Sequence, residues 1–281
     1  MGPGINALHL ETPLAQAFLK CLKDFNLRFM QIMAHTGNWM QPPHNVQLLE
    51  NDVHVWNAML DVAEEKLPFF LQILDVEEQT RANQFYFELD RTRFIVSHGL
   101  LRIILGSYIN IEPDKLRFSY NSQGKPFLAE SFQGKKLQFN MSHSHEFALF
   151  AVTFNRQIGV DLEHIYRFAE TDSLAHRILS KREKTAWCKY PPNERLDVLF
   201  RYWTCKEAYV KATGEGIAQP LEKIHISLTR GSEARLVSIN RSVREASRWS
   251  LQELHPLPGC AAALVVEGCD YRLNHWQWLQ D

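Results

Sequence analysis

The sequence has almost no excess of charge of either sign: 31 Lys and Arg residues oppose 32 Asp and Glu residues, giving a net charge of −1 over 281 residues. Proteins that bind nucleic acid usually carry a basic excess, so we expect no nucleic-acid partner. Long apolar runs are also missing, since no stretch approaches the roughly 20 residues that a membrane-spanning helix needs. The first residues lack the basic stretch and apolar core of a secretion signal. The sequence therefore predicts a cytoplasmic protein that does not enter a membrane.

Cysteine is scarce, and its spacing matches no known framework. The five cysteines are Cys21, Cys188, Cys205, Cys260 and Cys269, an odd number without C-x-x-C spacing. This pattern argues against both a disulfide framework and a zinc knuckle, and a reducing environment follows as the default.

Two parts of the chain repeat one order of elements, a long helix followed by several short strands. The helices are expected over residues 90–108 and 193–213. We therefore predict an α+β fold of two similar halves, residues 48–157 and 158–281, each with a long helix on a small, mostly antiparallel sheet and a cleft between them. Residues 1–47 precede both halves. Their apolar residues recur at helical spacing, which predicts one amphipathic helix, and we assign this segment no function.

The strand expected over residues 158–165 carries two carboxylates, Asp161 and Glu163. Side chains alternate along a strand, so these two point to the same face. Two like charges in one small volume are costly unless a cation lies between them, and oxygen ligands suit Mg²⁺ or Mn²⁺ better than zinc. The pair therefore indicates half of a metal site. The alternative is an edge strand with a solvated acidic face.

The second long helix carries Glu207 and Lys211, which are four residues apart and project from the same face. Most such pairs are surface ion pairs that contribute little to stability. Here the neighbours include Trp203, Tyr209 and Val210, which predict a covered helix facing a cleft. Glu207 is then a candidate third carboxylate ligand, because three carboxylates suit a magnesium ion that also binds substrate phosphates.

The segment from Asn140 to Ser144 places Ser142 beside His143. A serine-hydrolase nucleophile is not indicated, because the segment lacks the G-x-S-x-G turn that exposes such a serine. An exposed His143 flanked by hydroxyl groups can instead donate to a phosphate. In the first half the candidate phosphate donors are Arg81, Arg93 and Lys125. Taken singly, each of these basic residues is more often an ordinary solvated charge.

Three segments, taken together, resemble the ordered signatures of the 4′-phosphopantetheinyl transferases, in particular the long, monomeric surfactin-synthetase type. They are Phe139-Asn140-Met141-Ser142-His143-Ser144, Gly159-Val160-Asp161-Leu162-Glu163 and Trp203-Thr204-Cys205-Lys206-Glu207-Ala208-Tyr209-Val210-Lys211. Gly124-Lys125-Pro126 and the helix end at residues 100–106 also fit that family's first half. The resemblance covers about residues 53–266, and Leu162 stands where Ile or Val is commoner.

The resemblance implies a holo-[acyl-carrier-protein] synthase activity. Such an enzyme moves the phosphopantetheine group of coenzyme A to a serine of an acyl- or peptidyl-carrier protein and releases adenosine 3′,5′-bisphosphate. It implies that Asp161, Glu163 and Glu207 hold Mg²⁺, or Mn²⁺, against the pyrophosphate. Glu207, directly or through a metal-bound water, would take the serine proton, and Lys211 would neutralise or protonate the departing phosphate.

For the nucleotide, the resemblance implies that the first half supplies the contacts. His143, with the neighbouring Ser142, and Arg93 are expected to bind the 3′-phosphate of coenzyme A. Lys125 is expected near the nucleotide, and Arg81 is a further candidate. The resemblance also implies a monomer.

Carrier proteins are usually acidic around the modified serine, so a basic docking face is expected. The candidates precede the second long helix: Arg177, Lys181, Arg182, Lys184 and Lys189. The alternative for this cluster is a solvated helix face. For the whole protein, the alternative functions are a magnesium-dependent phosphohydrolase and a non-catalytic module that binds coenzyme A or a carrier protein.

Overall fold

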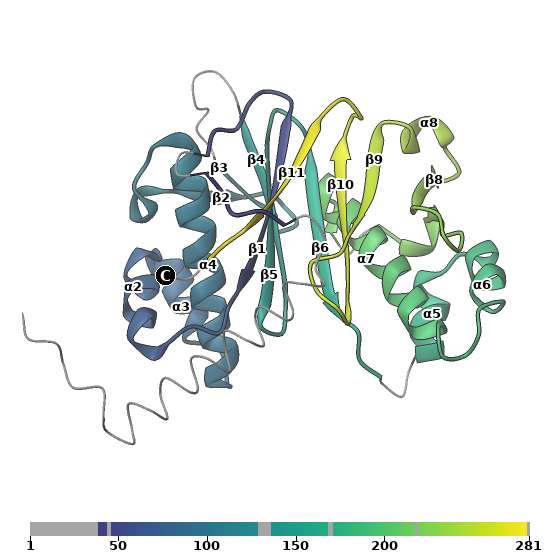
Figure 1. The fold of residues 1–281 in the computed structure, drawn as a ribbon, viewed down its shortest axis with the longest axis horizontal. Coiled ribbons are helices and arrows are strands. Elements are labelled where there is room, and N and C mark those ends of the chain that lie inside the picture. The colour runs from purple at the N-terminus through teal and green to yellow at the C-terminus, as the bar shows by residue number, and fades with distance from the viewer. Residues whose placement is uncertain (1–38, 44–45, 129–135, 168–170, 217–218, 280–281) are drawn as a thin grey trace, which may run out of the picture.

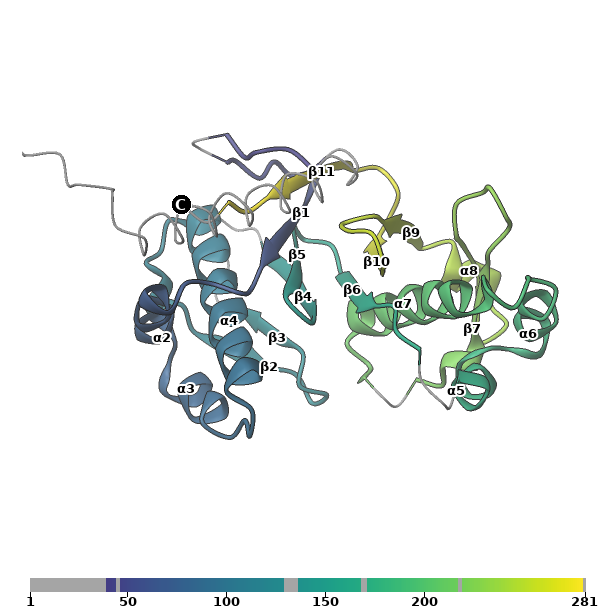
Figure 2. The same cartoon turned by 60° about the horizontal axis from the view of Figure 1, so that its bottom comes forward.

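The computed structural model describes residues 39–43, 46–128, 136–167, 171–216 and 219–279. The amphipathic helix expected between residues 14 and 32 lies outside this part of the chain. Two sheets lie between two long helices, α4 (Glu88–Ile109) and α7 (Arg195–Thr213), and both views show one helix on each outer side (Figure 1, Figure 2). The predicted α+β fold of two helix-on-sheet halves is confirmed.

The first sheet has four strands in the order β11-β1-β5-β4. Its helix α4 packs on it through a core that includes Leu100, Ile104 and Phe150. The strands are β1 (Asp52–Met59), β4 (Leu137–Ser144), β5 (Phe147–Phe154) and β11 (Arg272–Gln277). The smaller elements are η1 (Glu64–Lys66), α2 (Leu67–Ile73), α3 (Val76–Ala82), η2 (Pro113–Lys115) and the hairpin β2 (Phe118–Tyr120) with β3 (Pro126–Leu128).

The second sheet has three strands in the order β6-β10-β9, and α7 packs on its outer face. The strands are β6 (Ile158–His164), β9 (Trp249–Leu254) and β10 (Cys260–Glu267). The smaller elements are α5 (Thr171–Ile178), α6 (Lys181–Trp187), η4 (Leu221–Lys223), α8 (Val243–Ala246) and the hairpin β7 (Ile224–Ser227) with β8 (Arg235–Ile239). Helix α7 ends at Gly214, whose φ of 71° is the left-handed conformation of a C-terminal glycine cap.

The two sheets pack against each other through a third apolar core. Val53, Val55 and Leu149 from the first sheet meet Val160 and Leu264 from the second. The resulting order is helix, sheet, sheet, helix. Among the residues that the structure describes, no helix has both the length and the apolar character needed to cross a bilayer.

The last strand, β11, was not among the elements expected from the sequence. It pairs in parallel with β1, so residues from the predicted second half complete the sheet of the first half. Met40 extends this edge, because its N–H donates to His275 O at 3.0 Å and its carbonyl accepts from Gln277 N at 2.8 Å. The C-terminal strand therefore ties the two halves together on this side of the molecule.

Candidate active site

Side chains of β4 join the two sheets along the edge where β4 lies beside β6. The polar residues at alternate positions of β4 point towards β6 and accept hydrogen bonds from its backbone. Val160 N donates to Asn140 Oδ1 at 2.8 Å, Leu162 N to Ser142 Oγ at 3.2 Å, and His164 N to Ser144 Oγ at 3.0 Å. The sequence motifs at residues 139–144 and 159–163 thus lie side by side.

Asp161 is at the centre of this seam and is 3% exposed. Its Oδ1 accepts hydrogen bonds from Lys211 Nζ at 2.6 Å and from Ser142 Oγ at 3.1 Å. Its Oδ2 is buried and has no hydrogen-bond partner among the described residues. A buried carboxylate oxygen without a partner is costly, so this atom is available to a ligand.

The negative charge of Asp161 affects the pKa values of Glu163 and Glu207. Burial, with the charge of Asp161 as the next cause, raises the pKa of Glu163 to about 7, and Glu207 adds to the shift. Burial and then the charge of Asp161 likewise raise the pKa of Glu207, while Lys211 opposes the rise. Three carboxylates from β6 and α7 therefore influence one another's protonation.

The donors at this point suit a hard cation. All three carboxylates offer oxygen, the ligand atom that Mg²⁺ prefers, and the unpartnered Oδ2 of Asp161 is the kind of atom that such an ion would satisfy. Within the described ranges, however, no group of three or more His, Cys, Asp or Glu side chains is arranged to hold a metal ion. The chemistry of the residues fits magnesium, and their convergence on one ion stays a prediction.

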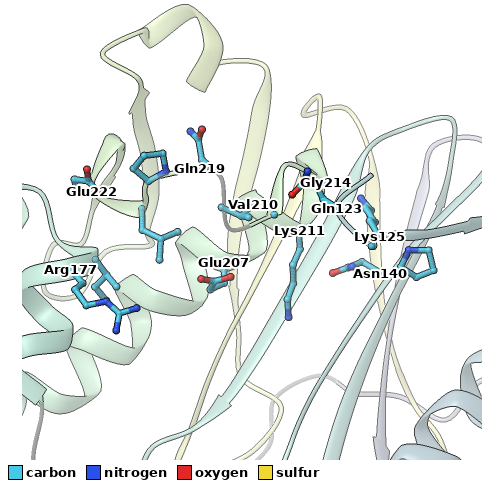
Figure 3. A pocket seen from close by; sticks show the side chains of 16 residues that line it. Gln123, Lys125, Asn140, Arg177, Glu207, Val210, Lys211, Gly214, Gln219 and Glu222 are labelled. Atoms are coloured by element: carbon cyan, nitrogen blue, oxygen red, sulfur yellow. The ribbon is translucent and has the colours of Figure 1, made fainter. Parts of the chain in front are cut away.

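A cavity of ≈ 670 Å³ opens beside α7. Figure 3 shows Glu207 and Lys211 extending from the helix, between Arg177 on one side and Asn140 on the other. The far wall is formed by Lys125 and the neighbouring turn of the first half. The candidate base and the candidate acid therefore face the same space.

A second cavity of ≈ 400 Å³ lies in the first half. The two cavities adjoin, because Gly124, Pro126, Asn140 and Lys211 line both. The walls of the second cavity combine aromatic residues with mostly basic ones and one acidic residue: Phe85, Phe94, Phe118, Tyr120, Arg81, His98, His143 and Glu78. Aromatic faces and positively charged groups are suited to a nucleotide with phosphate groups.

Comparisons with known proteins agree with this site. Residues 157–266 match the family model of the 4′-phosphopantetheinyl transferase superfamily, and residues 56–155 match that of the 4′-phosphopantetheinyl transferase N-terminal region. The 4′-phosphopantetheinyl transferase HetI of Nostoc is 42% identical over 247 residues, which cover 88% of this chain and 100% of HetI. The chain belongs to the 4′-phosphopantetheinyl transferase superfamily.

Other relatives of the transferase are more distant. Sfp of Bacillus subtilis, also a 4′-phosphopantetheinyl transferase, is 23% identical over 62% of this chain and 75% of its own. Gsp of Aneurinibacillus migulanus is 30% identical over 63% and 67%. These matches agree with the Sfp type expected from the sequence. A solved ACPS–CoA complex from Chronobacterium ammoniagenes covers 42% of this chain and 98% of its own, at 22% identity and a TM-score of 0.34, which supports no argument about the fold.

The transferase brings three of the predicted nucleotide residues to the first-half cavity: Ser142, His143 and Arg81. His143 reaches solvent, whereas Ser142 points into the seam. Partial burial and the positive charges nearby lower the pKa of His143 below its usual value. The Arg81 guanidinium lies 5.6 Å from the centre of the Phe94 ring.

The other two predicted nucleotide residues have protein partners. Arg93 donates to both carboxylate oxygens of Asp61, at 2.9 and 3.2 Å, and this contact raises the pKa of Arg93. Lys125 lines the cavity beside α7, but its ammonium group donates to two backbone carbonyls, Ile158 O and Ala212 O. Nucleotide binding by these two residues stays a prediction.

His98 also lines the first-half cavity, although it was not among the candidate residues expected from the sequence. The His98 ring stacks on Phe94 with ring centres 4.0 Å apart, and its Nδ1 lies 3.0 Å from Glu78 Oε1. The available signal was a histidine on the apolar face of the first long helix, which alone did not indicate a site.

The basic residues proposed for docking separate into groups. Lys181 and Arg182 are exposed and line a depression together with Lys223 and Arg241. Arg177 instead borders the cavity that contains Glu207. Lys184 lies against His176.

Proposed function

We propose that this transferase moves the 4′-phosphopantetheine group of coenzyme A to a serine of an acyl- or peptidyl-carrier protein and releases adenosine 3′,5′-bisphosphate. The observation that carries the proposal is the junction at Lys211. This lysine contacts Asp161 and borders both cavities, one with aromatic and basic walls and one with Glu207. A nucleotide and a reacting group can therefore lie on either side of it.

In this proposal the first-half cavity receives the nucleotide. Its aromatic side chains offer faces for a base, and His143 and Arg81 offer donors for the 3′-phosphate. The Ser142 hydroxyl donates to Asp161 Oδ1, so Ser142 would contact the phosphate only by giving up that hydrogen bond. Arg93 and Lys125 would join them only by giving up part of their present hydrogen bonds. The pyrophosphate would then extend past Lys211 towards the carboxylates.

Asp161, Glu163 and Glu207 are the residues that would hold Mg²⁺, or Mn²⁺. A divalent ion bound there supplies charge neutralisation for the pyrophosphate that an incoming serine oxygen must approach. Asp161 Oδ2 is the oxygen best placed to contribute, because it is buried and without a protein partner among the described residues.

Glu207 is proposed as the general base. Its raised pKa makes it a better proton acceptor than an ordinary carboxylate, so it suits removal of the serine proton. The serine oxygen forms a bond to the β-phosphorus of coenzyme A. At the same time the bond breaks between that phosphorus and the oxygen that leaves with adenosine 3′,5′-bisphosphate. Lys211 is positioned to neutralise or protonate that leaving group.

The test is to incubate the protein with coenzyme A, Mg²⁺ and an apo-carrier protein and to weigh the carrier. We expect a mass gain of one phosphopantetheine group, roughly 340 Da, on a serine. Phosphate release from simple phosphoesters without any carrier would favour a phosphohydrolase. Binding of coenzyme A without any transfer would favour a non-catalytic module.

We also propose that the protein acts as a monomer in the cytoplasm. Cys188, Cys205, Cys260 and Cys269 are free thiols, which agrees with a reducing compartment. Size-exclusion chromatography with light scattering tests the monomer, and a mass near twice 32.7 kDa would contradict it.

A further inference from the structure

The turn between β2 and β3 of the first half lies against the C-terminal end of the catalytic helix α7. Figure 3 shows Gln123 and Lys125 beside Gly214, where the helix ends. Asn121 Nδ2 donates to Gly214 O at 3.0 Å. Lys125 Nζ donates to Ala212 O at 2.9 Å and to Ile158 O at 3.0 Å. Three hydrogen bonds thus cross from one half to the other at this point.

The two carbonyls that share the Lys125 ammonium belong to the elements that carry the reacting groups. Ile158 begins β6, which continues to Asp161, and Ala212 follows Lys211 directly in α7. A single cation therefore holds the start of the acidic strand and the end of the catalytic helix to the same turn. Burial among these groups lowers the pKa of Lys125 to about 8, as expected for an ammonium group turned away from solvent.

The fit between the turn and the helix end is close. A Cβ atom at Gly214 would lie 2.8 Å from Asn121 Nδ2 and 3.1 Å from Lys125 Cδ. A Cβ atom at Gly216 would lie 3.1 Å from Gln123 Cβ. Both glycines have positive φ, 71° and 62°, which other residues rarely adopt. The contact surface therefore leaves no room for side chains at the end of α7.

The same turn separates the two cavities of the site. Gly124 and Pro126 line both of them, so a substrate that extends from one cavity into the other passes this turn. The position of the turn therefore decides how far a nucleotide held by the first half lies from Glu207 in the second half.

We propose that Asn121 and Lys125 are positioning residues that fix the catalytic helix relative to the nucleotide cavity. The inference rests on the proposed transfer reaction for its kinetic readout. A reacting group displaced by about 1 Å can lose about 100-fold in rate. Loss of these hydrogen bonds should therefore lower kcat and leave the affinity for coenzyme A unchanged.

Asn121→Asp is the sharpest test, because it removes a hydrogen bond to α7 while keeping the hydrogen bonds within the turn. Asn121 Oδ1 accepts from Gln123 N and from Lys125 N, both at 2.9 Å, and an aspartate retains this acceptor. The substitution removes the Nδ2 donor and places an oxygen against Gly214 O. Ser122→Ala is the matched control, because it lies in the same turn, is exposed, and has no role in the proposal.

We expect Asn121→Asp to lower kcat by about tenfold or more, with KM for coenzyme A within about twofold of the wild-type value. Lys125→Met should show the same split, and Ser122→Ala should match the wild type. If Lys125 instead contacts the nucleotide, Lys125→Met should raise KM for coenzyme A. Asn121→Asp should then have wild-type kinetics. That pattern would overturn the positioning role.

Amide hydrogen exchange of residues 208–216 gives a readout that needs no activity. The last turn of α7 should exchange faster in Asn121→Asp and Lys125→Met than in Ser122→Ala, because it has lost its contacts with the turn. Unchanged exchange in both variants would overturn the inference. Absence of transfer in the wild-type protein would instead reject the proposed function, and hydrogen exchange would still decide whether the turn holds the helix.

Discussion

The two halves of the molecule share one architecture, but a buried charged side chain in each half differs in how completely it is hydrogen-bonded. In the first half Arg102 is fully buried and fully paired. It donates to Glu78 and to Asp75, both at 2.6 Å, and to two backbone carbonyls. In the second half Asp161 is almost as buried, but one of its two oxygens has no partner among the described residues.

This difference between Arg102 and Asp161 reflects the candidate active site and is not a general property of the second half. The second half also contains a satisfied pair, Lys206 with Glu183, in which the fully buried ammonium donates to the carboxylate at 2.7 Å and to two carbonyls. A buried charge with every partner in place is compatible with a structural role, and removing one partner is costly, whereas an unsatisfied buried charge indicates a place for a ligand. The comparison therefore separates structural charges from functional ones within one chain.

Replacing Glu207 should produce the largest effect on activity and little effect on stability. Glu207→Gln is expected to lower transfer by about 10²–10⁴-fold, because it removes the proposed base. The midpoint of thermal unfolding should not fall, since the removed carboxylate repels Asp161. Carrier mass and calorimetry measure the two quantities, with Glu215→Gln, an exposed residue just after the same helix, as the control. Wild-type transfer in Glu207→Gln would contradict the assignment.

Replacing Arg102 should have the opposite pattern, with a large loss of stability from a residue outside the proposed catalytic groups. Arg102→Met leaves Glu78 buried without its cation, which typically costs about 3–5 kcal/mol of unfolding free energy. Urea denaturation measures the loss. The double variant Arg102→Met with Glu78→Gln should recover part of it, because the fully buried carboxylate charge of Glu78 is removed together with its cation. A single variant as stable as the wild type would break the distinction between the two kinds of buried charge.

The pH dependence of magnesium binding should show a smaller effect. The pKa of Glu163 is raised to about 7, above that of a free carboxyl group, so the metal-free folded protein holds this proton more tightly than the unfolded chain. Its contribution to stability is full below pH 4.5 and is lost as the pH rises through 7. Magnesium must displace the proton, so it should bind about tenfold more weakly at pH 6 than at pH 8.

Thermal unfolding with and without Mg²⁺ measures this difference. The rise in Tm on adding Mg²⁺ should be larger at pH 8 than at pH 6. Glu163→Gln should remove most of the pH dependence. An equal rise at both pH values in the wild-type protein would argue against Glu163 as a magnesium ligand.

The smallest effect is expected at the basic surface. Reversing the charge of Lys181 and Arg182 together should raise KM for an acidic carrier protein a few-fold and leave KM for coenzyme A unchanged, because exposed charges act mainly on association. Arg244→Glu, an exposed residue of the same half, is the control. An unchanged KM for the carrier would assign these residues to a solvated helix face.

Local periodicity accounts for the parts of the site that the sequence predicted. Asp161 and Glu163 share a face because side chains alternate along a strand, and Glu207 and Lys211 share a face because they are one helical turn apart. The helices of residues 90–108 and 193–213 were likewise predicted close to the observed α4 and α7. In each case the decisive interaction lies within a few residues of the chain.

What the tertiary structure alone decided involves partners that are distant in sequence. Strand β11 pairs with β1 across about 220 residues, and no local pattern indicates which edge an isolated strand will join. Arg93 and Lys125 are long side chains with many partners within reach. Packing within the first half directs Arg93 to Asp61, and packing of the two halves directs Lys125 to the end of α7. The residue types and their spacing thus determined the chemistry, and tertiary contacts decided where each charge is held.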